Sequence, residues 1–151
     1  MSDNDAHGAK MLSVRIHEQD FALDIGAVRE IRGWTPATPL PHAPPYVLGM
    51  VNLRGAVVAI LDLGARLGLA PSEPGPSSVV VVVEVEGRTV GLLVDAVSDI
   101  VTVPAEMIQA APDVGTEAIQ DVLRGITDID GRLVSILAIA AVLPHGAVLA
   151  A

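Results

Sequence analysis

The sequence has 151 residues, of which 51% are hydrophobic and 18% charged, and its mean hydropathy is +0.55. This composition supports a buried core and excludes a disordered chain. Nine basic and eighteen acidic residues give a formal net charge of -9, which is the wrong sign for holding phosphate backbones, so nucleic acid is not expected as a partner.

The sequence contains no cysteine, which excludes disulfide scaffolds and thiolate zinc sites and is typical of a reducing compartment such as the cytoplasm. Residues 1–10 are polar and acidic and lack the pattern of a secretory signal, so they are predicted to form a flexible tail. The longest nearly apolar run, 133–143, has 11 residues, and a bilayer span needs roughly 18 to 20. Direct membrane insertion is therefore not expected.

Short strands are predicted throughout the first half, because apolar and polar residues alternate there. In chain order they cover residues 12–16, 21–25, 28–31, 47–53 and 56–61. The first two read as an antiparallel hairpin. A proline-rich surface loop is predicted over 35–45, since proline lacks a ladder donor. Asp62 is typical of the N-cap of a short helix over 63–67.

A stretch rich in proline and serine over 70–78 predicts a linker, and the second half of the chain after it again predicts short strands. Its predicted strands cover residues 79–85, 89–94, 98–103, 125–128 and 133–137. Pro104 is typical of the start of a short helix, and Asp130-Gly131 favours a type I′ hairpin turn. The alanine-rich residues 138–143 predict a C-terminal helix, and 144–151 a frayed tail.

The predicted fold class is all-β with short helices, made of two small five-stranded barrels or sandwiches. The folded unit is expected over 11–143. Its boundaries are predicted at about 11–69 for the first subdomain, 70–78 for the linker, 79–137 for the second subdomain and 138–143 for the helix.

Catalytic motifs are not found in the sequence. It has one lysine, four scattered histidines and no P-loop, nucleophile elbow or paired-histidine metal motif. No catalytic residue, cofactor or metal is therefore predicted. Paired carboxylates such as Asp95 and Asp99 could serve acid and base roles, but a solvated acidic surface explains them better.

One constellation in the first half points to binding. Gly49 and Gly55 bracket a nearly apolar segment whose single charge is Arg54, a setting predicted to hold the guanidinium beside backbone. Glu30, on the predicted strand 28–31, is its candidate partner, since an arginine fork takes a carboxylate bidentately. The pair would either orient a docking site or only tie two strands together.

Six sequence blocks carry a resemblance to a known family. They are V-R-E-I-R-G at 28–33, P-P-Y-V-L-G-M-V-N-L-R-G at 44–55, A-I-L-D-L at 59–63, R-T-V-G-L-L-V-D-A-V-S-D-I at 88–100, R-G-I at 124–126 and D-G-R-L-V-S-I-L at 130–137. In this order and spacing they resemble the CheW family of chemotaxis coupling proteins. The likeness extends from about residue 11 to residue 143.

This resemblance implies two SH3-like five-stranded barrels that share an apolar seam. It implies a non-catalytic, cytoplasmic adaptor that couples chemoreceptors to the histidine kinase CheA and is recruited to membrane-associated arrays. The implied partners are the regulatory domain of CheA and the helical cytoplasmic tip of the receptor. Ring assembly with kinase domains is also implied.

The resemblance further implies a set of partner-binding residues. Matched by motif position, they are Val28, Glu30, Gly49, Arg54 and Ile100, with Val57 and Val79 as weaker candidates on flanking strands. Tryptophan at position 34 stands where the family more usually has tyrosine, which affects the detail of one loop.

Two alternatives remain open at this point. One is an adaptor of the same family that serves a non-flagellar system, such as pili or surface sensing. The other is a small hydrolase or ligand-binding β-barrel that uses Asp95 or Asp99, which would require a formed polar pocket around either carboxylate.

Overall fold

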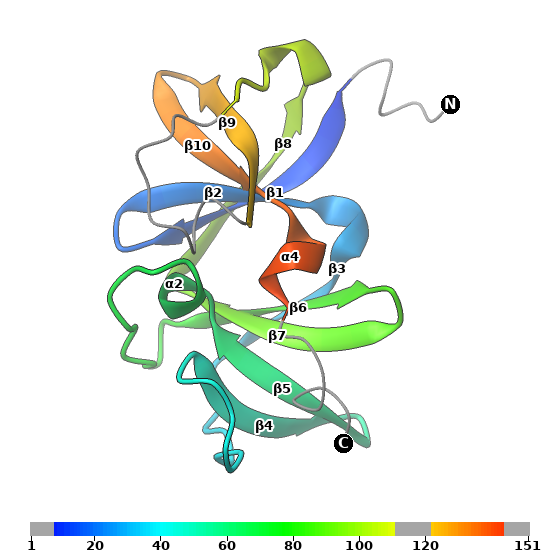
Figure 1. The fold of residues 1–151 in the computed structure, drawn as a ribbon, viewed down its shortest axis with the longest axis vertical. Helices are drawn as coiled ribbons and strands as arrows, with labels where there is room; N and C mark the ends of the chain where they lie inside the picture. Colours follow the sequence, from blue (N-terminus) through cyan, green and yellow to red (C-terminus); the bar gives the residue numbers. More distant parts are fainter. Residues whose placement is uncertain (1–7, 111–121, 144–151) are drawn as a thin grey trace.

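Two five-stranded sheets form the computed structural model, which describes residues 8–110 and 122–143 (Figure 1). The strands are β1 (Ala9–Ile16), β2 (Gln19–Asp24), β3 (Val28–Gly33), β4 (Val47–Leu53), β5 (Ala56–Asp62), β6 (Val79–Val85), β7 (Arg88–Val94), β8 (Ala96–Val103), β9 (Leu123–Ile129) and β10 (Arg132–Leu137). Sheet A has the order β8-β1-β2-β10-β9, and sheet B has the order β3-β6-β7-β5-β4. The predicted fold class is confirmed.

Local sequence explains most elements. The hairpin of β1 and β2 turns at His17 and Glu18, and Asp130-Gly131 joins β9 to β10 with positive φ at both residues, as a type I′ turn requires. Asp62 accepts a hydrogen bond from the Ala65 N–H and so caps α2 (Leu63–Arg66). Two 3₁₀ turns, η1 (Ile25–Ala27) and η2 (Ala105–Met107), precede β3 and follow β8.

The predicted division into consecutive subdomains 11–69 and 79–137 does not match the sheets. The hairpin β1–β2 lies in sheet A, whereas β3, β4 and β5 lie in sheet B; β6 and β7 then join sheet B, and β8, β9 and β10 return to sheet A. The predicted linker 70–78 therefore connects two elements of the same sheet. Alternation in the sequence predicts strands but not which strands pair, because pairing is decided by non-local burial.

The two sheets repeat one another in detail. Each has a hairpin, an edge strand antiparallel to it and a two-strand hairpin joined in parallel. The register irregularity opposite Ser13 and Val14 in sheet A recurs between Val28 and Glu30 in sheet B. The chain is therefore a tandem repeat in which each half gives its hairpin to the other half's three strands.

Three apolar clusters explain why several strands are buried on both faces. The central cluster lies between the sheets and includes Val81 and Val83 of β6, whereas Val80 and Val82 face a second cluster within sheet B. A third cluster lies within sheet A and includes Met11 and Ile136. The nearly continuous valine run of β6 is thus a strand covered on both sides.

The helix α4 (Ile139–Val142) confirms the predicted C-terminal helix and lies between the two sheets (Figure 1). Arg66 at the end of α2 donates hydrogen bonds from Nε to the Val142 carbonyl at 2.9 Å and from Nη2 to the Ala141 carbonyl at 2.8 Å. Its guanidinium also lies 5.4 Å from the centre of the Tyr46 ring. This arginine therefore links α2 to α4 at the junction of the sheets.

The ends of the folded unit differ slightly from the prediction. Residues 9 and 10, expected in the tail, belong to β1 and pair with Val103 and Thr102. Residues 1–7 and the predicted frayed tail 144–151 lie outside the described residues. Within 8–110 and 122–143, none of the helices has the length and apolar character that crossing a membrane would require.

Candidate functional site

Glu30 of β3 lies between two arginines at the surface of sheet B. Its Oε2 accepts a hydrogen bond from Arg54 Nη2 at 3.0 Å and lies 3.5 Å from Arg32 Nη1. The carboxylate is well covered, with 23% of the side chain exposed. Glu30 and Arg32 share one face of β3 because side chains two residues apart point the same way. The predicted pairing of Glu30 with Arg54 is thus observed.

The turn between β4 and β5 places Arg54. Its φ is 55°, and Gly55 follows with φ of 88°, so the two residues form a tight hairpin turn with positive φ throughout. The side chain is 78% exposed, so the guanidinium is not held beside backbone as predicted. A two-residue turn projects its side chains away from the sheet, and among the described residues the ion pair with Glu30 fixes the direction of the Arg54 side chain.

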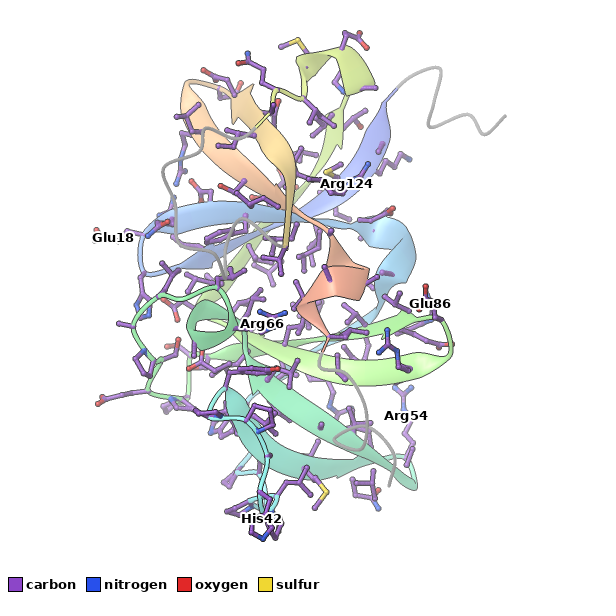
Figure 2. All side chains as sticks on the ribbon, viewed as in Figure 1. Glu18, His42, Arg54, Arg66, Glu86 and Arg124 are labelled. Carbon is purple, nitrogen blue, oxygen red and sulfur yellow. The ribbon has the colours of Figure 1, made fainter. Side chains whose placement is uncertain are left out.

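A surface groove of about 410 Å³ runs past this ion pair. The turn of β4 and β5, the strand β3 and the turn of β6 and β7 all contribute to it. Its lining consists of Arg29, Glu30, Leu53, Arg54, Ala56, Val57, Val58, Val82, Gly87, Arg88 and Thr89. We call it the Glu30–Arg54 groove. Figure 2 shows Arg54 and Glu86 on the same side of the molecule, which is where these two turns meet.

The groove combines positive charge with an apolar strip. Arg29, Arg54 and Arg88 line it against the single carboxylate of Glu30. Arg29 Nε also donates a hydrogen bond to Glu84 Oε1 at 3.2 Å, and Arg88 Nη2 forms an ion pair with Glu86 Oε2 at 3.5 Å. Val57 is 58% exposed beside them. A charged rim next to an exposed aliphatic surface is typical of a protein-docking site rather than of a catalytic cavity.

Gly49 acts below the groove rather than in it. Its φ is 150°, and an added Cβ would lie 2.4 Å from the Thr38 carbonyl oxygen. That close approach lets Thr38 and Met50 exchange backbone hydrogen bonds of 2.8 and 2.7 Å, which pins the proline-rich loop against β4. The glycine therefore supports the β4 hairpin that carries Arg54.

The other predicted residues lie elsewhere. Val28 and Val79 pack against the central cluster, and Ile100, which is 55% exposed, belongs to β8 of sheet A. The structure thus brings Glu30, Arg54 and Val57 together but not these three.

Sequence analysis missed the contribution of residues 87–89 to the groove. The strand prediction contained β6 and β7 but not their position next to β3 and β5, so no local signal could have found it.

The carboxylates considered for catalysis have structural roles. Asp95 accepts a hydrogen bond from the His17 N–H at 2.8 Å, and Asp99 Oδ1 accepts from the Ile100 N–H at 2.8 Å. Asp95 does not line any of the grooves described, whereas Asp99 lines an open one of about 150 Å³. Within the described residues, no group of three histidine, aspartate or glutamate side chains could hold a metal ion.

Comparison with known proteins gives a consistent result. The model of the family described as "CheW-like domain" matches residues 10–147. The chain is 50% identical over 137 residues to the chemotaxis protein CheW of Rhizobium meliloti, covering 91% of this chain and 88% of that protein. It is 31% identical to the chemotaxis protein CheW of Bacillus subtilis over 137 residues, covering 90% and 87%.

The solved structures include a similar fold. The crystal structure of the scaffolding protein TtCheW from Thermoanaerobacter tengcongensis matches with a TM-score of 0.78 at 28% identity, covering 86% of this chain and 88% of that one. The fold of two five-stranded sheets is therefore similar to that of a protein whose crystal structure is known.

Proposed function

The chain belongs to the CheW family, and we propose that it couples chemoreceptors to the histidine kinase CheA with the Glu30–Arg54 groove as its receptor-docking surface. It is a chemotaxis adaptor, and the kinase partner is the regulatory domain of CheA. The observation that carries the docking proposal is the Glu30 carboxylate held between Arg54 and Arg32 at the rim of an apolar strip.

The groove suits the helical tip of a receptor. A helix presents an apolar stripe with charged residues beside it, and Val57 offers an exposed aliphatic contact while Arg54 offers a charge whose direction Glu30 fixes. A small, open groove gives modest affinity, and an array of many such contacts acts together. Gly49 supports this surface by holding the β4 hairpin in place. Val28 and Val79 are proposed to act through the central cluster, and Ile100 to contact partners from sheet A.

Two finer statements belong to the same proposal. The protein acts without catalysis, supported by the structural roles of Asp95 and Asp99 and by the scaffold character of its solved relative. It works in the cytoplasm and reaches the membrane through receptors. Service to a flagellar system, or to a pilus or surface-sensing system, depends on which receptor and kinase the protein meets.

The direct test is binding of a purified receptor cytoplasmic tip to Arg54→Ala. We expect affinity to fall about tenfold, since truncation of a central interface arginine costs 1–2 kcal/mol or more. Arg124→Ala is the matched control, because Arg124 also stands in a Leu-Arg-Gly sequence and is exposed, but lies within β9 of sheet A. Equal affinity of Arg54→Ala and wild type would refute the proposal.

Exchanging the charges of Glu30 and Arg54 tests whether the ion pair orients the docking site or only supplies charge to it. In Glu30→Arg with Arg54→Glu the ion pair is reversed, and receptor binding should return in part relative to Arg54→Ala if the pair orients the site. If binding and thermal stability instead fall together in Arg54→Ala, the ion pair only ties β3 to the β4–β5 turn.

A further inference from the structure

Residues 63–70, which we call the α2 segment, are held firmly to sheet B. Strand β5 of that sheet leads directly into the segment. Asp62 at the junction accepts hydrogen bonds from the Ala65 N–H at 3.2 Å and from the Ser72 N–H at 2.8 Å. The Asp62 side chain is buried, and hydrogen bonds shielded from water are strengthened. The α2 segment therefore moves with β5.

The same segment also contacts elements that belong to sheet A. Gly64 packs directly against Ile16 of β1, since an added Cβ would lie 2.9 Å from Ile16 Cγ2. Arg66 donates two hydrogen bonds, of 2.9 and 2.8 Å, to backbone carbonyls of α4, and α4 follows β10 of sheet A after one residue. The α2 segment is thus joined both to the hairpin and to the helix of sheet A.

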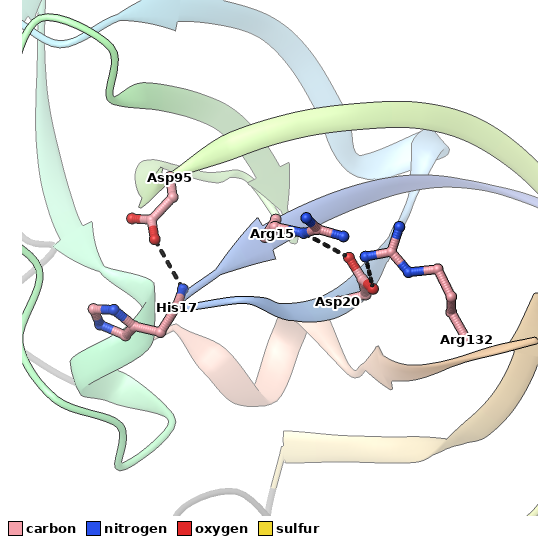
Figure 3. A network of polar contacts seen from close by, with 5 residues as sticks. All are labelled: Arg15, His17, Asp20, Asp95 and Arg132. Atoms are coloured by element: carbon pink, nitrogen blue, oxygen red, sulfur yellow. Dashed lines mark hydrogen bonds and ion pairs between the residues drawn. The ribbon is translucent and has the colours of Figure 1, made fainter.

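A further contact comes from the turn between β1 and β2. His17 Nε2 donates a hydrogen bond to the Ala70 carbonyl oxygen at 2.8 Å. The His17 N–H donates to Asp95 Oδ2, also at 2.8 Å (Figure 3). Asp95 stands between β7 of sheet B and β8 of sheet A. The turn is therefore fixed at two points to segments that leave sheet B.

This turn is itself rigidly attached to sheet A. Asp20 of β2 has a side chain that is only 10% exposed and forms ion pairs with Arg15 Nε at 3.2 Å and Arg132 Nη2 at 2.6 Å (Figure 3). Arg15 belongs to β1 and Arg132 to β10, so one carboxylate ties three strands of sheet A together beside the turn. A displacement of His17 relative to sheet B therefore displaces these three strands as well.

The polar contacts of Arg66 and His17 differ in kind from the central apolar cluster, which also lies between the sheets. Apolar contact is non-directional, so it holds the sheets together without selecting one angle between them, whereas hydrogen bonds have a defined geometry. Because a strand extends by about 3.3 Å per residue, a tilt of about 10° would move the far end of the seven-residue β5 by about 4 Å. Residues 56–58, which line the Glu30–Arg54 groove, lie at that far end.

We propose that Arg66 and His17 are positioning residues, which set the orientation of sheet A relative to sheet B and thereby allow the adaptor to hold two partners at once. Each partner still binds alone when the sheets tilt. An assembly that contains both partners requires both binding surfaces in fixed positions, because simultaneous binding is lost when the geometry forbids it. This role rests on the proposed function, in which the receptor binds on sheet B and Ile100 contacts partners from sheet A.

The test uses the full chain with Arg66→Met and His17→Asn. Methionine keeps an apolar side chain but has no donor. Asparagine tolerates the φ of 49° at position 17 but is too short to reach Ala70. The matched control is Thr127→Val, which removes a buried hydrogen bond of 2.9 Å to the Met107 carbonyl, between β9 and η2. The control thus loses a similar bond outside the α2 segment.

Three measurements are made on each protein. Residual dipolar couplings report the orientation of the two sheets, calorimetry gives the affinity for the receptor tip and for the kinase regulatory domain separately, and sedimentation gives the yield of assemblies that contain all three proteins. In wild type and in Thr127→Val, one alignment tensor should fit both sheets. In the double variant the sheets should need separate tensors, each partner alone should bind within about twofold of wild type, and the yield of assemblies should fall at least about fivefold.

One tensor equal to that of wild type in the double variant overturns the proposal. Full assembly despite separate tensors also overturns it, and so does a loss of affinity for one partner alone that matches the loss of assembly. If the double variant does not fold, His17→Asn alone, at an exposed position, is judged by the same outcomes. Failure of wild type to bind the receptor tip would refute the proposed function, whereas the dipolar couplings would still judge the orientation.

Discussion

The Glu30–Arg54 groove and the open groove lined by Asp99 and Asp130 have turns of the same backbone conformation, but the charges of their linings are opposite. Their turns have φ values within a few degrees of each other, and exposed aliphatic side chains recur at equivalent positions of the two sheets, Val57 with Leu133 and Ile31 with Ile100. Arginine at position 54 and aspartate at position 130 reverse the electrostatics. The fold therefore supplies two equivalent turns, and a few side chains give the surfaces beside them opposite charge.

The two repeats also differ in the short helices α2 and α4, which lie where the two sheets meet. Asp62 caps α2, whereas Ala138 at the equivalent position before α4 provides no side-chain cap. Arg66 of α2 reaches across to the carbonyls of α4. The first repeat thus holds the helix of the second in place, which keeps the two sheets, and hence the two grooves, in a fixed relation.

The largest loss of stability is expected at two equivalent glycines that pack closely against a neighbouring backbone segment. Gly49 and its counterpart Gly125 each face a backbone carbonyl, and an added Cβ would lie 2.4 Å from Thr38 O or 2.6 Å from Gln109 O. Gly49→Ala should lower the free energy of unfolding by about 2–4 kcal/mol, because it adds strain at positive φ to the clash. Gly125→Ala should cost about 1–3 kcal/mol. Urea unfolding measures both.

Gly55→Ala serves as the control for that pair. An added Cβ at Gly55 meets nothing within 4 Å, although φ is 88°, so only the backbone cost of about 1–2 kcal/mol applies. A loss for Gly49→Ala no larger than for Gly55→Ala would contradict the claimed close approach to Thr38.

Arg66→Ala tests the link between the sheets. It removes two hydrogen bonds from a charged donor to half-buried carbonyls and the contact with Tyr46. The unfolding free energy should fall by about 1.5–3 kcal/mol, the range for hydrogen bonds to charged groups. Arg66→Lys keeps the charge but loses the fork, so it should recover only part. Full recovery by lysine would show that charge alone matters.

Asp130→Arg makes the second groove resemble the first at one position. Arg54 already occupies a turn with the same φ, so the substitution fits, and the new guanidinium should pair with Asp99 as Arg54 pairs with Glu30. The free energy of unfolding should therefore change by less than about 1 kcal/mol. Urea unfolding checks this, and a loss as large as that expected for Gly49→Ala would contradict the equivalence of the two turns.

The smallest effect is expected for the stability of Arg54→Ala. The ion pair with Glu30 is largely exposed on the arginine side, and such pairs contribute about 0.2–1 kcal/mol. Thermal unfolding should shift by only a few degrees. A much larger loss would mean that Arg54 is chiefly a structural residue.

Much of this fold could be read from local sequence. The predicted strands 47–53 and 79–85 match β4 and β6 residue for residue, and the turn at Asp130-Gly131 is where its φ preference requires it. The exchange of hairpins between the halves could not be read locally. A signal was nevertheless present, because Ala-Val-Arg-Glu-Ile at 27–31 and Ala-Val-Ser-Asp-Ile at 96–100 repeat the same pattern.

The candidate site was predicted only in part, because some of its residues have a local sequence signal and others depend on how the strands pair. Glu30 and Arg54 could be paired from charge complementarity within a short apolar segment, and the structure joins them. Ile100 could not be placed, because its sheet depends on the hairpin exchange. The match of Leu-Arg-Gly at 53–55 with 123–125 would have misled, since the structural counterpart of Arg54 is Asp130 and not Arg124.

The most direct measurement maps the receptor tip onto the isotope-labelled full chain by amide chemical-shift perturbation. The account predicts that the largest shifts occur at Glu30, Arg54 and Val57 and at residues 87–89, with Asp99 and Asp130 unaffected. Receptor-induced shifts centred on Asp99 and Asp130, with the residues around Arg54 unchanged, would contradict it.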